Sequence, residues 1–100
     1  MSKNKVVKKW KSFLKLNSWN IVTVEIEPEQ VMYDEDIPQK DRYYVGIDID
    51  HDTKTGVIYH DRLLKEEYII HELLHVKYPK EDEEWIVNKT DDLFRLIQLD

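Results

Sequence analysis

Apolar and polar residues alternate along this chain with two different periods, and these periods predict helices and strands. Three segments place apolar residues three or four positions apart, which is the spacing of one face of a helix. The first covers residues 4–17, and the second begins at Asp61 or Arg62 and runs to about Lys77. The third runs from about residue 82 to residue 98, with Asp82 as its candidate N-cap.

Between the first and second predicted helices, three segments alternate with a period of two, which predicts strands. The first is Ile21–Glu27, and its buried face is expected to carry Val22, Val24 and Ile26. The second is Tyr43–Asp50, with one face formed by Val45, Ile47 and Ile49. The third is Val57–His60, and the turn residues before it predict a hairpin with the second strand.

The order of these elements predicts a single α+β domain over residues 1–100. We expect an N-terminal helix, a three-stranded mainly antiparallel sheet and two C-terminal helices, with the helices against one face of the sheet. The acidic segment from Glu29 to Arg42 contains Pro38 and is expected to be a loop, with a turn of helix near residues 28–33.

The composition narrows the class of protein. The chain is 41% apolar, which is enough for one modest core. It contains no Cys, which excludes disulfides, thiolate zinc sites and a Cys nucleophile, and which is typical of a reducing cytoplasm. No apolar run approaches a membrane span, and the N-terminus lacks the apolar core of a signal peptide. We therefore expect a cytoplasmic protein without a membrane partner.

Charge is unevenly distributed along the chain. Residues 1–24 carry six Lys and no acid, although the whole chain has a net charge of −6. Lys8, Lys11 and Lys15 lie between apolar positions of the first predicted helix, which indicates a solvent-exposed helix face. The rest of the chain holds all 21 Asp and Glu residues, and this acidity argues against nucleic acid as the main partner.

The most informative motif lies in the second predicted helix. His71-Glu72-Leu73-Leu74-His75 has the pattern H-E-x-x-H. A helix places residues four apart on one face, so both imidazoles can bind the same Zn²⁺ ion. Glu72 projects beside them and can take a proton from water at the metal, which makes it a candidate general base. The sequence therefore predicts a zinc cofactor and a catalytic role for Glu72.

A catalytic zinc needs a third protein ligand. One common arrangement has a turn Gly and then a His six residues after the second motif His, but these positions hold Tyr78 and Glu81 here. Another arrangement uses a Glu on a following helix, and Glu84 in the first turn of the third helix is favoured. Asn88, four residues further on, is placed to orient a ligand His. Glu83 and Glu81 remain alternatives because predicted helix starts shift by a residue or two.

With H-E-L-L-H followed by Glu84-x-x-x-Asn88, the chain resembles the gluzincins, which are thermolysin-like zinc metallopeptidases with a ligand Glu on a later helix. Its length, spacing and element order look most like the minigluzincins, the minimal single-domain members. The resemblance covers about residues 5–98 in architecture, and its specific motifs lie in residues 71–88. It implies an edge of the sheet that binds an extended peptide, and Glu72 as general base and acid. The zinc ligands that it implies are His71, His75 and Glu84.

The resemblance also implies differences from the larger gluzincins, which add a subdomain with a Tyr or His that stabilises the tetrahedral intermediate. Tyr78, Tyr68 and Arg95 are the candidates for that role here. Minigluzincins are latent, with a C-terminal segment over the active site. The segment from Leu96 to Asp100, apolar and then acidic, is interpreted either as such a zymogen-like block or as the end of the third helix.

The remaining His and Trp residues are interpreted as structural. His51 in the hairpin turn and His60 at a strand end are expected at the surface or in turns, not at the metal. The three tryptophans are expected to pack in the core and at its rim, not to form a substrate cage. These are Trp10, Trp19 and Trp85.

The leading functional hypothesis is a zinc metallopeptidase, a hydrolase that cleaves peptide or protein substrates with Glu72 activating water. One alternative is a non-catalytic, zinc-stabilised peptide-binding or regulatory domain, although a structural site would need the two histidines and not Glu72. A second alternative is a regulator-cleaving peptidase of the kind found beside phage repressors, which usually carry a DNA-binding module that this sequence does not contain.

Overall fold

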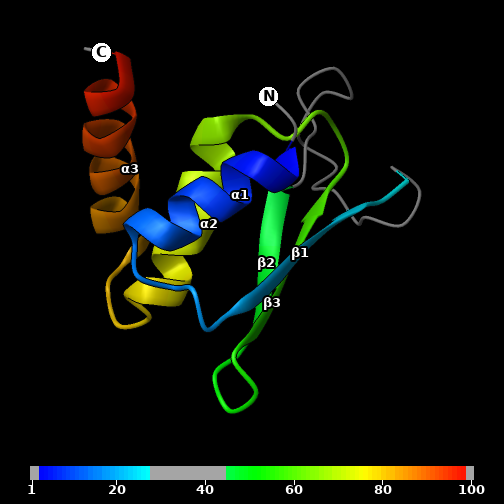
Figure 1. The fold of residues 1–100 in the computed structure, drawn as a ribbon. Helices are drawn as coiled ribbons and strands as arrows, with labels where there is room; N and C mark the ends of the chain where they lie inside the picture. The colour runs from blue at the N-terminus through cyan, green and yellow to red at the C-terminus, as the bar shows by residue number, and fades with distance from the viewer. Residues whose placement is uncertain (1–2, 28–44, 99–100) are drawn as a thin grey trace, which may run out of the picture.

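The computed structural model describes residues 3–27 and 45–98. It contains three helices and three strands in the order predicted from the sequence (Figure 1). The elements are α1 (Lys3–Phe13), β1 (Asn20–Glu25), β2 (Val45–Asp50), β3 (Thr55–His60), α2 (Glu66–Lys77) and α3 (Glu83–Gln98). The α+β class and the element order are therefore confirmed, whereas the loop predicted from Glu29 to Arg42 lies outside the described residues.

The three strands form one sheet in the order β1-β3-β2, with β3 in the centre. β2 and β3 are antiparallel, which confirms the predicted hairpin. β1 and β3 are parallel, so the sheet is mixed and has one pairing of each kind. Parallel strands need a long connection, and the chain between β1 and β3 is long enough because it includes β2.

The face of β1 that turns toward the core differs from the prediction. Ile21 is buried and Thr23 is half-buried, whereas Val22 and Val24 are 45% and 39% exposed. The pairing explains this difference, because Ile21 and Thr23 lie beside Gly56 and Ile58, the buried positions of β3. The period-two pattern was correct, but its phase was wrong, and a shift of one residue exchanges the two faces of a strand.

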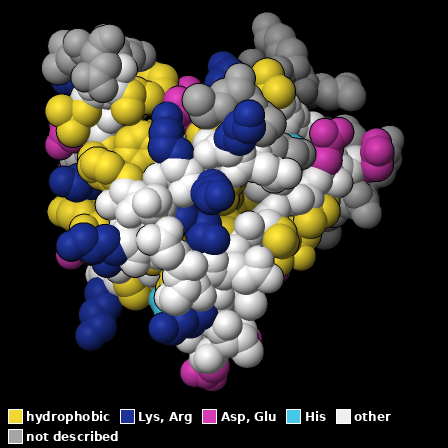
Figure 2. All heavy atoms as spheres, in the orientation of Figure 1, with side chains coloured by type: hydrophobic (Ala, Val, Ile, Leu, Met, Phe, Trp, Pro, Cys, Tyr) yellow, Lys and Arg dark blue, Asp and Glu magenta, His cyan; other side chains and the backbone are white. Residues whose placement is uncertain are grey.

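α1 is an amphipathic helix that ends earlier than predicted. Its apolar side is buried through Val6, Val7 and Trp10, while Lys and Arg side chains lie on the solvent side over α1 (Figure 2). The helix ends at Phe13 because Lys15 adopts a left-handed φ of 60°. The N–H of Leu16 then donates to the carbonyl of Lys11 at 2.7 Å, which closes the helix end.

α2 begins at Glu66 and not at Asp61 or Arg62. The segment between β3 and α2 is not helical. A hydrogen bond fixes its start, because Nδ1 of His60 donates to the carbonyl of Arg62 at 2.7 Å. His60 is only 1% exposed, so the prediction of a surface or turn histidine was wrong. Position 60 follows the buried positions of the central strand at intervals of two, which places its side chain inside the domain.

α2 occupies the middle of the helical layer and packs against α1, α3 and β2 (Figure 1). Its buried residues supply much of the core, including Ile69, Ile70, Leu73 and Leu74. In the described part of the chain, no helix is both long enough and apolar enough to cross a membrane. The central position of α2 lets residues on one of its sides face both α3 and the sheet.

α3 begins at Glu83, directly after its predicted cap. The carboxylate of Asp82 accepts a hydrogen bond from the N–H of Trp85 at 2.8 Å, which confirms Asp82 as the N-cap. Ile86 and Leu93 of the predicted apolar stripe are buried, whereas Leu96 is exposed. The helix then continues to Gln98, so its two ends are about 22 Å apart.

Candidate metal centre

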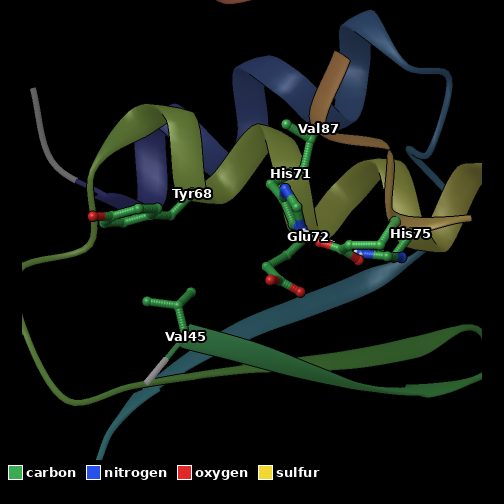
Figure 3. Close-up of a pocket in the computed structure, with 7 residues that line it drawn as sticks. Val45, Tyr68, His71, Glu72, His75 and Val87 are labelled. Atoms are coloured by element: carbon green, nitrogen blue, oxygen red, sulfur yellow. Dashed lines mark hydrogen bonds and ion pairs between the residues drawn. The ribbon is translucent and has the colours of Figure 1, made fainter. Parts of the chain in front are cut away.

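The two motif histidines lie on the side of α2 that faces α3. Because they are four residues apart, they occupy successive turns of the same helix side. Leu73 and Leu74, between them in the sequence, are fully buried in the core. These buried leucines hold α2 in the core, and both imidazoles are half-buried at its edge (Figure 3).

The side chain of Glu83 brings a carboxylate from α3 to both imidazoles. Its Oε1 lies 2.7 Å from Nε2 of His71, and its Oε2 lies 2.9 Å from Nε2 of His75. The two Nε2 atoms are themselves 3.3 Å apart. Three groups of the kinds that ligate metals therefore converge on one point, and they come from two helices joined by the turn at residues 78–82.

This cluster fits a zinc ion. Two nitrogen ligands at about 2.0–2.1 Å from a tetrahedral zinc are about 3.3–3.4 Å apart, which matches the separation of the two Nε2 atoms. The carboxylate is slightly closer to the imidazoles than two ligands of one metal would be, and it belongs to a side chain that is 63% exposed and can move outward. Two imidazoles and one carboxylate are also a ligand set of catalytic zinc, with one position left for water.

The pKa of His71 favours metal binding. Burial lowers this pKa below its usual value, and repulsion from His75 lowers it further, although the Glu83 carboxylate acts in the opposite direction. A histidine must be neutral to ligate a metal, so a lowered pKa keeps the ligating form available at neutral pH. The pairing with Glu83 fixes which nitrogen is offered, because it directs Nε2 of His71 toward the cluster.

Glu83, and not Glu84, joins the two histidines. Glu84 is the next residue on α3, so its side chain leaves the helix about 100° further around the axis and is exposed. Glu81 lies in the turn before α3, outside the cluster. Asn88, which was expected to orient a histidine, is also exposed and does not line the adjoining pocket. The residue four positions after Glu83 is Val87, which does line it.

A pocket of about 430 Å³ adjoins the cluster. It is bounded by α2, by α3 and by the first residue of β2, and its lining residues are Val45, Tyr68, His71, Glu72, His75, Glu83 and Val87. Figure 3 shows Glu72 pointing from α2 toward Val45, into the space between helix and sheet. The imidazoles and the Glu72 carboxylate therefore face one cavity that opens to solvent.

The Glu72 carboxyl group lies in a poorly solvated place. The residue is only 6% exposed, and burial, with repulsion from Glu83 as a smaller cause, raises its pKa to about 7. Among the residues that the structure describes, none forms a hydrogen bond or ion pair with this carboxyl group. A carboxyl group with a pKa near neutrality and with free oxygens can both accept and return a proton at neutral pH.

The other candidate residues lie elsewhere. His51 is exposed at the hairpin turn, as predicted, with its ring 5.2 Å from that of Trp19. His60 is buried outside the cluster. Val45 and Val87 were not recognised from the sequence as parts of the site. The spacing of Val87 from Glu83 would have indicated it only if Glu83 had been chosen as the ligand.

Comparisons with known proteins add no assignment. No protein-family model matches this chain, and neither a curated protein nor a solved structure matches it. The functional argument therefore depends on the chemistry of the cluster and its pocket.

Proposed function

We propose that this protein is a zinc-dependent hydrolase of peptide bonds. The observation that carries the proposal is the position of the Glu72 carboxyl group, which shares one pocket with two imidazole nitrogens 3.3 Å apart and with the Glu83 carboxylate. His71, His75 and Glu83 would hold the metal. The zinc ion, when bound, supplies a Lewis acid that polarises a carbonyl group and lowers the pKa of water.

The protein's own residues have distinct parts in this mechanism. Glu72 accepts a proton from the attacking water, and it returns a proton to the leaving amine when the peptide bond breaks. In the metal-free protein, burial raises the pKa of this carboxyl group to about 7, so both of its protonation states are accessible near neutral pH. Val45 and Val87 supply apolar walls beside the reacting groups and reduce the access of other water molecules.

The candidates for stabilising the intermediate differ in position. Tyr68 lines the pocket, but its hydroxyl points away from the two imidazoles (Figure 3). Tyr78 packs against Trp85, with ring centroids 5.0 Å apart, and Arg95 is exposed three turns of α3 beyond Glu83. The mechanism therefore assigns none of them the stabilisation of the intermediate.

The C-terminal segment is not part of this proposal. Leu96 and Ile97 lie within α3, near the end that is about 22 Å from Glu83. The interpretation of the segment from Leu96 to Asp100 as a zymogen-like block stays a prediction. Residues 99–100 themselves lie outside the described residues.

The test is cleavage of a mixed peptide library by zinc-loaded protein, with the products identified by mass spectrometry. We expect cleavage that chelation abolishes and that the Glu72→Gln variant reduces by about 10²–10⁴-fold, while the variant still binds zinc. Cleavage by the variant at the wild-type rate would show that Glu72 is not the base. Stabilisation by zinc without cleavage of any peptide would instead favour the non-catalytic alternative.

A further inference from the structure

A second, smaller pocket continues from the metal centre along the groove between α2 and α3. Its volume is about 160 Å³, and its lining residues are Glu67, Tyr68, His71, Val87, Thr90 and Asp91. Tyr68, His71 and Val87 also line the larger pocket, so the two cavities are adjacent parts of one groove. A ligand that lies beside the imidazoles can extend a side chain into the smaller pocket.

Helical spacing places two acidic residues at the far end of this groove. Glu67 precedes His71 by four residues on α2, which is about 6 Å along the helix axis. Asp91 follows Glu83 by eight residues on α3, which is about 12 Å. Glu67 and Asp91 therefore line the pocket at the end away from Glu83, and they are not part of the cluster of His71, His75 and Glu83.

The lining of the pocket offers hydrogen-bond acceptors and includes no Lys or Arg. In residues 3–27 and 45–98, neither Glu67 nor Asp91 forms an ion pair. The Thr90 hydroxyl is buried and donates its proton to the carbonyl of Ile86 at 2.7 Å, so its oxygen is left to accept. The walls between these groups and the imidazoles are the side chains of Tyr68 and Val87.

This combination is complementary to a long basic side chain. Lys and Arg have apolar stems and a cationic head that only donates hydrogen bonds. The stem would lie along Tyr68 and Val87, and the head would meet the two carboxylates. An acidic side chain would be repelled there, and an apolar one would leave the carboxylates without a partner.

We propose that the pocket lined by Glu67 and Asp91 selects a Lys or Arg side chain of the bound peptide, next to the bond that is cleaved. This inference rests on the proposed function for its account of cleavage, but the binding preference can be measured separately. The two carboxylates are specificity residues, because they meet a side chain of the substrate and not the reacting atoms.

The experiment uses eight-residue peptides that are uncharged except for one residue, which is moved through every position and is Lys, norleucine or Glu. Norleucine keeps the stem of Lys and lacks its charge. Cleavage by the zinc-loaded protein is followed by mass spectrometry, and binding to the zinc-loaded Glu72→Gln variant is followed by calorimetry. At one position we expect Lys to be preferred over norleucine on the order of 10-fold, and over Glu by more.

The variant that tests the pocket is Glu67→Gln/Asp91→Asn, made in both the active and the Glu72→Gln backgrounds. It should remove the preference for Lys and leave norleucine peptides bound as before. The matched control is Glu84→Gln/Asp92→Asn, which removes the same charge from exposed positions outside both pockets. The control should keep the preference, and added salt should weaken that preference in the wild type.

Each outcome has a defined meaning. Cleavage without a preference for Lys at any position overturns the inference and leaves the proposed function intact. A preference in binding that the pocket variant removes, with no cleavage of any peptide, supports the inference and rejects the peptidase. Equal loss of preference in the pocket variant and in the control would show that general charge, and not this pocket, attracts Lys.

Discussion

Asp82 accepts a hydrogen bond from the backbone N–H of Trp85 at 2.8 Å, and this bond sets the first turn of α3. Glu83, the residue immediately after Asp82, brings its carboxylate to both motif histidines. The cap therefore stabilises the turn of α3 that carries Glu83 beside α2. The cap of α3 and the candidate metal centre are therefore linked, because Asp82 and Glu83 are adjacent in the sequence.

This link predicts that Asp82→Ala weakens both folding and metal binding. The variant should lose about 1 kcal/mol of unfolding free energy, since the first turn of α3 loses its cap. Zinc affinity should fall as well, because a frayed first turn no longer holds Glu83 in place. Asp82→Asn is the control, since Asn caps helices as well as Asp does and the same charge is removed. Unfolding by urea and zinc titration measure the two effects, and wild-type zinc affinity in Asp82→Ala would contradict the link.

The identity of the third ligand can be tested with two neighbouring variants. Glu83→Gln should weaken zinc binding on the order of 100-fold or more, because the loss of even an outer partner of a ligand costs about 10–100-fold. Glu84→Gln should bind zinc nearly as the wild type does, since its side chain is exposed away from the cluster. Competition with a chelator of known affinity measures both. If Glu84→Gln instead weakened zinc binding more than Glu83→Gln does, Glu84 would be the third ligand.

Glu72 should reduce the stability of the metal-free protein as the pH rises. Its pKa is raised to about 7 in the folded state from an ordinary value of 4.5. The folded state then binds more protons than the unfolded state between these values, so stability falls as the pH rises through that window. Glu72→Gln removes this penalty and should be more stable than the wild type at pH 8, by about 1–3 kcal/mol. The difference should be much smaller at pH 5.

Urea unfolding of both proteins with a chelator present measures this effect. An equal difference at pH 5 and at pH 8 would show that the ionisation of Glu72 does not cause it. Bound zinc should reduce the penalty, because a nearby cation favours the ionised carboxylate.

Glu66 should have the opposite dependence on pH. Burial acts to raise its pKa, but hydrogen bonds from Lys9 and Trp10, each at 2.6 Å, outweigh this and lower the pKa. The stabilisation is present above the ordinary carboxyl pKa and is lost as the pH falls through the lowered value. Glu66→Gln should therefore lose about 1–2 kcal/mol at pH 7 and much less near pH 3.

Glu67→Gln is the matched control for Glu66, since both residues lie in the first turn of α2. A similar loss in the control at pH 7 would assign the effect to the helix dipole and not to the contact between α1 and α2. Thermal unfolding at the two pH values compares the variants directly.

The sequence by itself determined the features that depend on neighbouring residues. The period of apolar positions predicted the helices and strands in order, and the turn residues before Val57 predicted the hairpin of β2 and β3. The pairing of His71 with His75 followed from helix geometry, because residues four apart share a side whatever the helix packs against. Asp82 as a cap also depends only on the next three residues.

Only the tertiary structure decided which face of β1 is buried and which of two neighbouring glutamates on α3 faces α2. The alternating pattern of β1 allowed either face to be buried, and pairing with β3 buried Ile21 instead of Val22. Glu83 and Glu84 follow His75 by eight and nine residues, but they differ by about 100° around α3, and the packing of α3 on α2 selects Glu83. Such choices are non-local, because they depend on how side chains of separate elements fit together in the core and not on the period within any one segment.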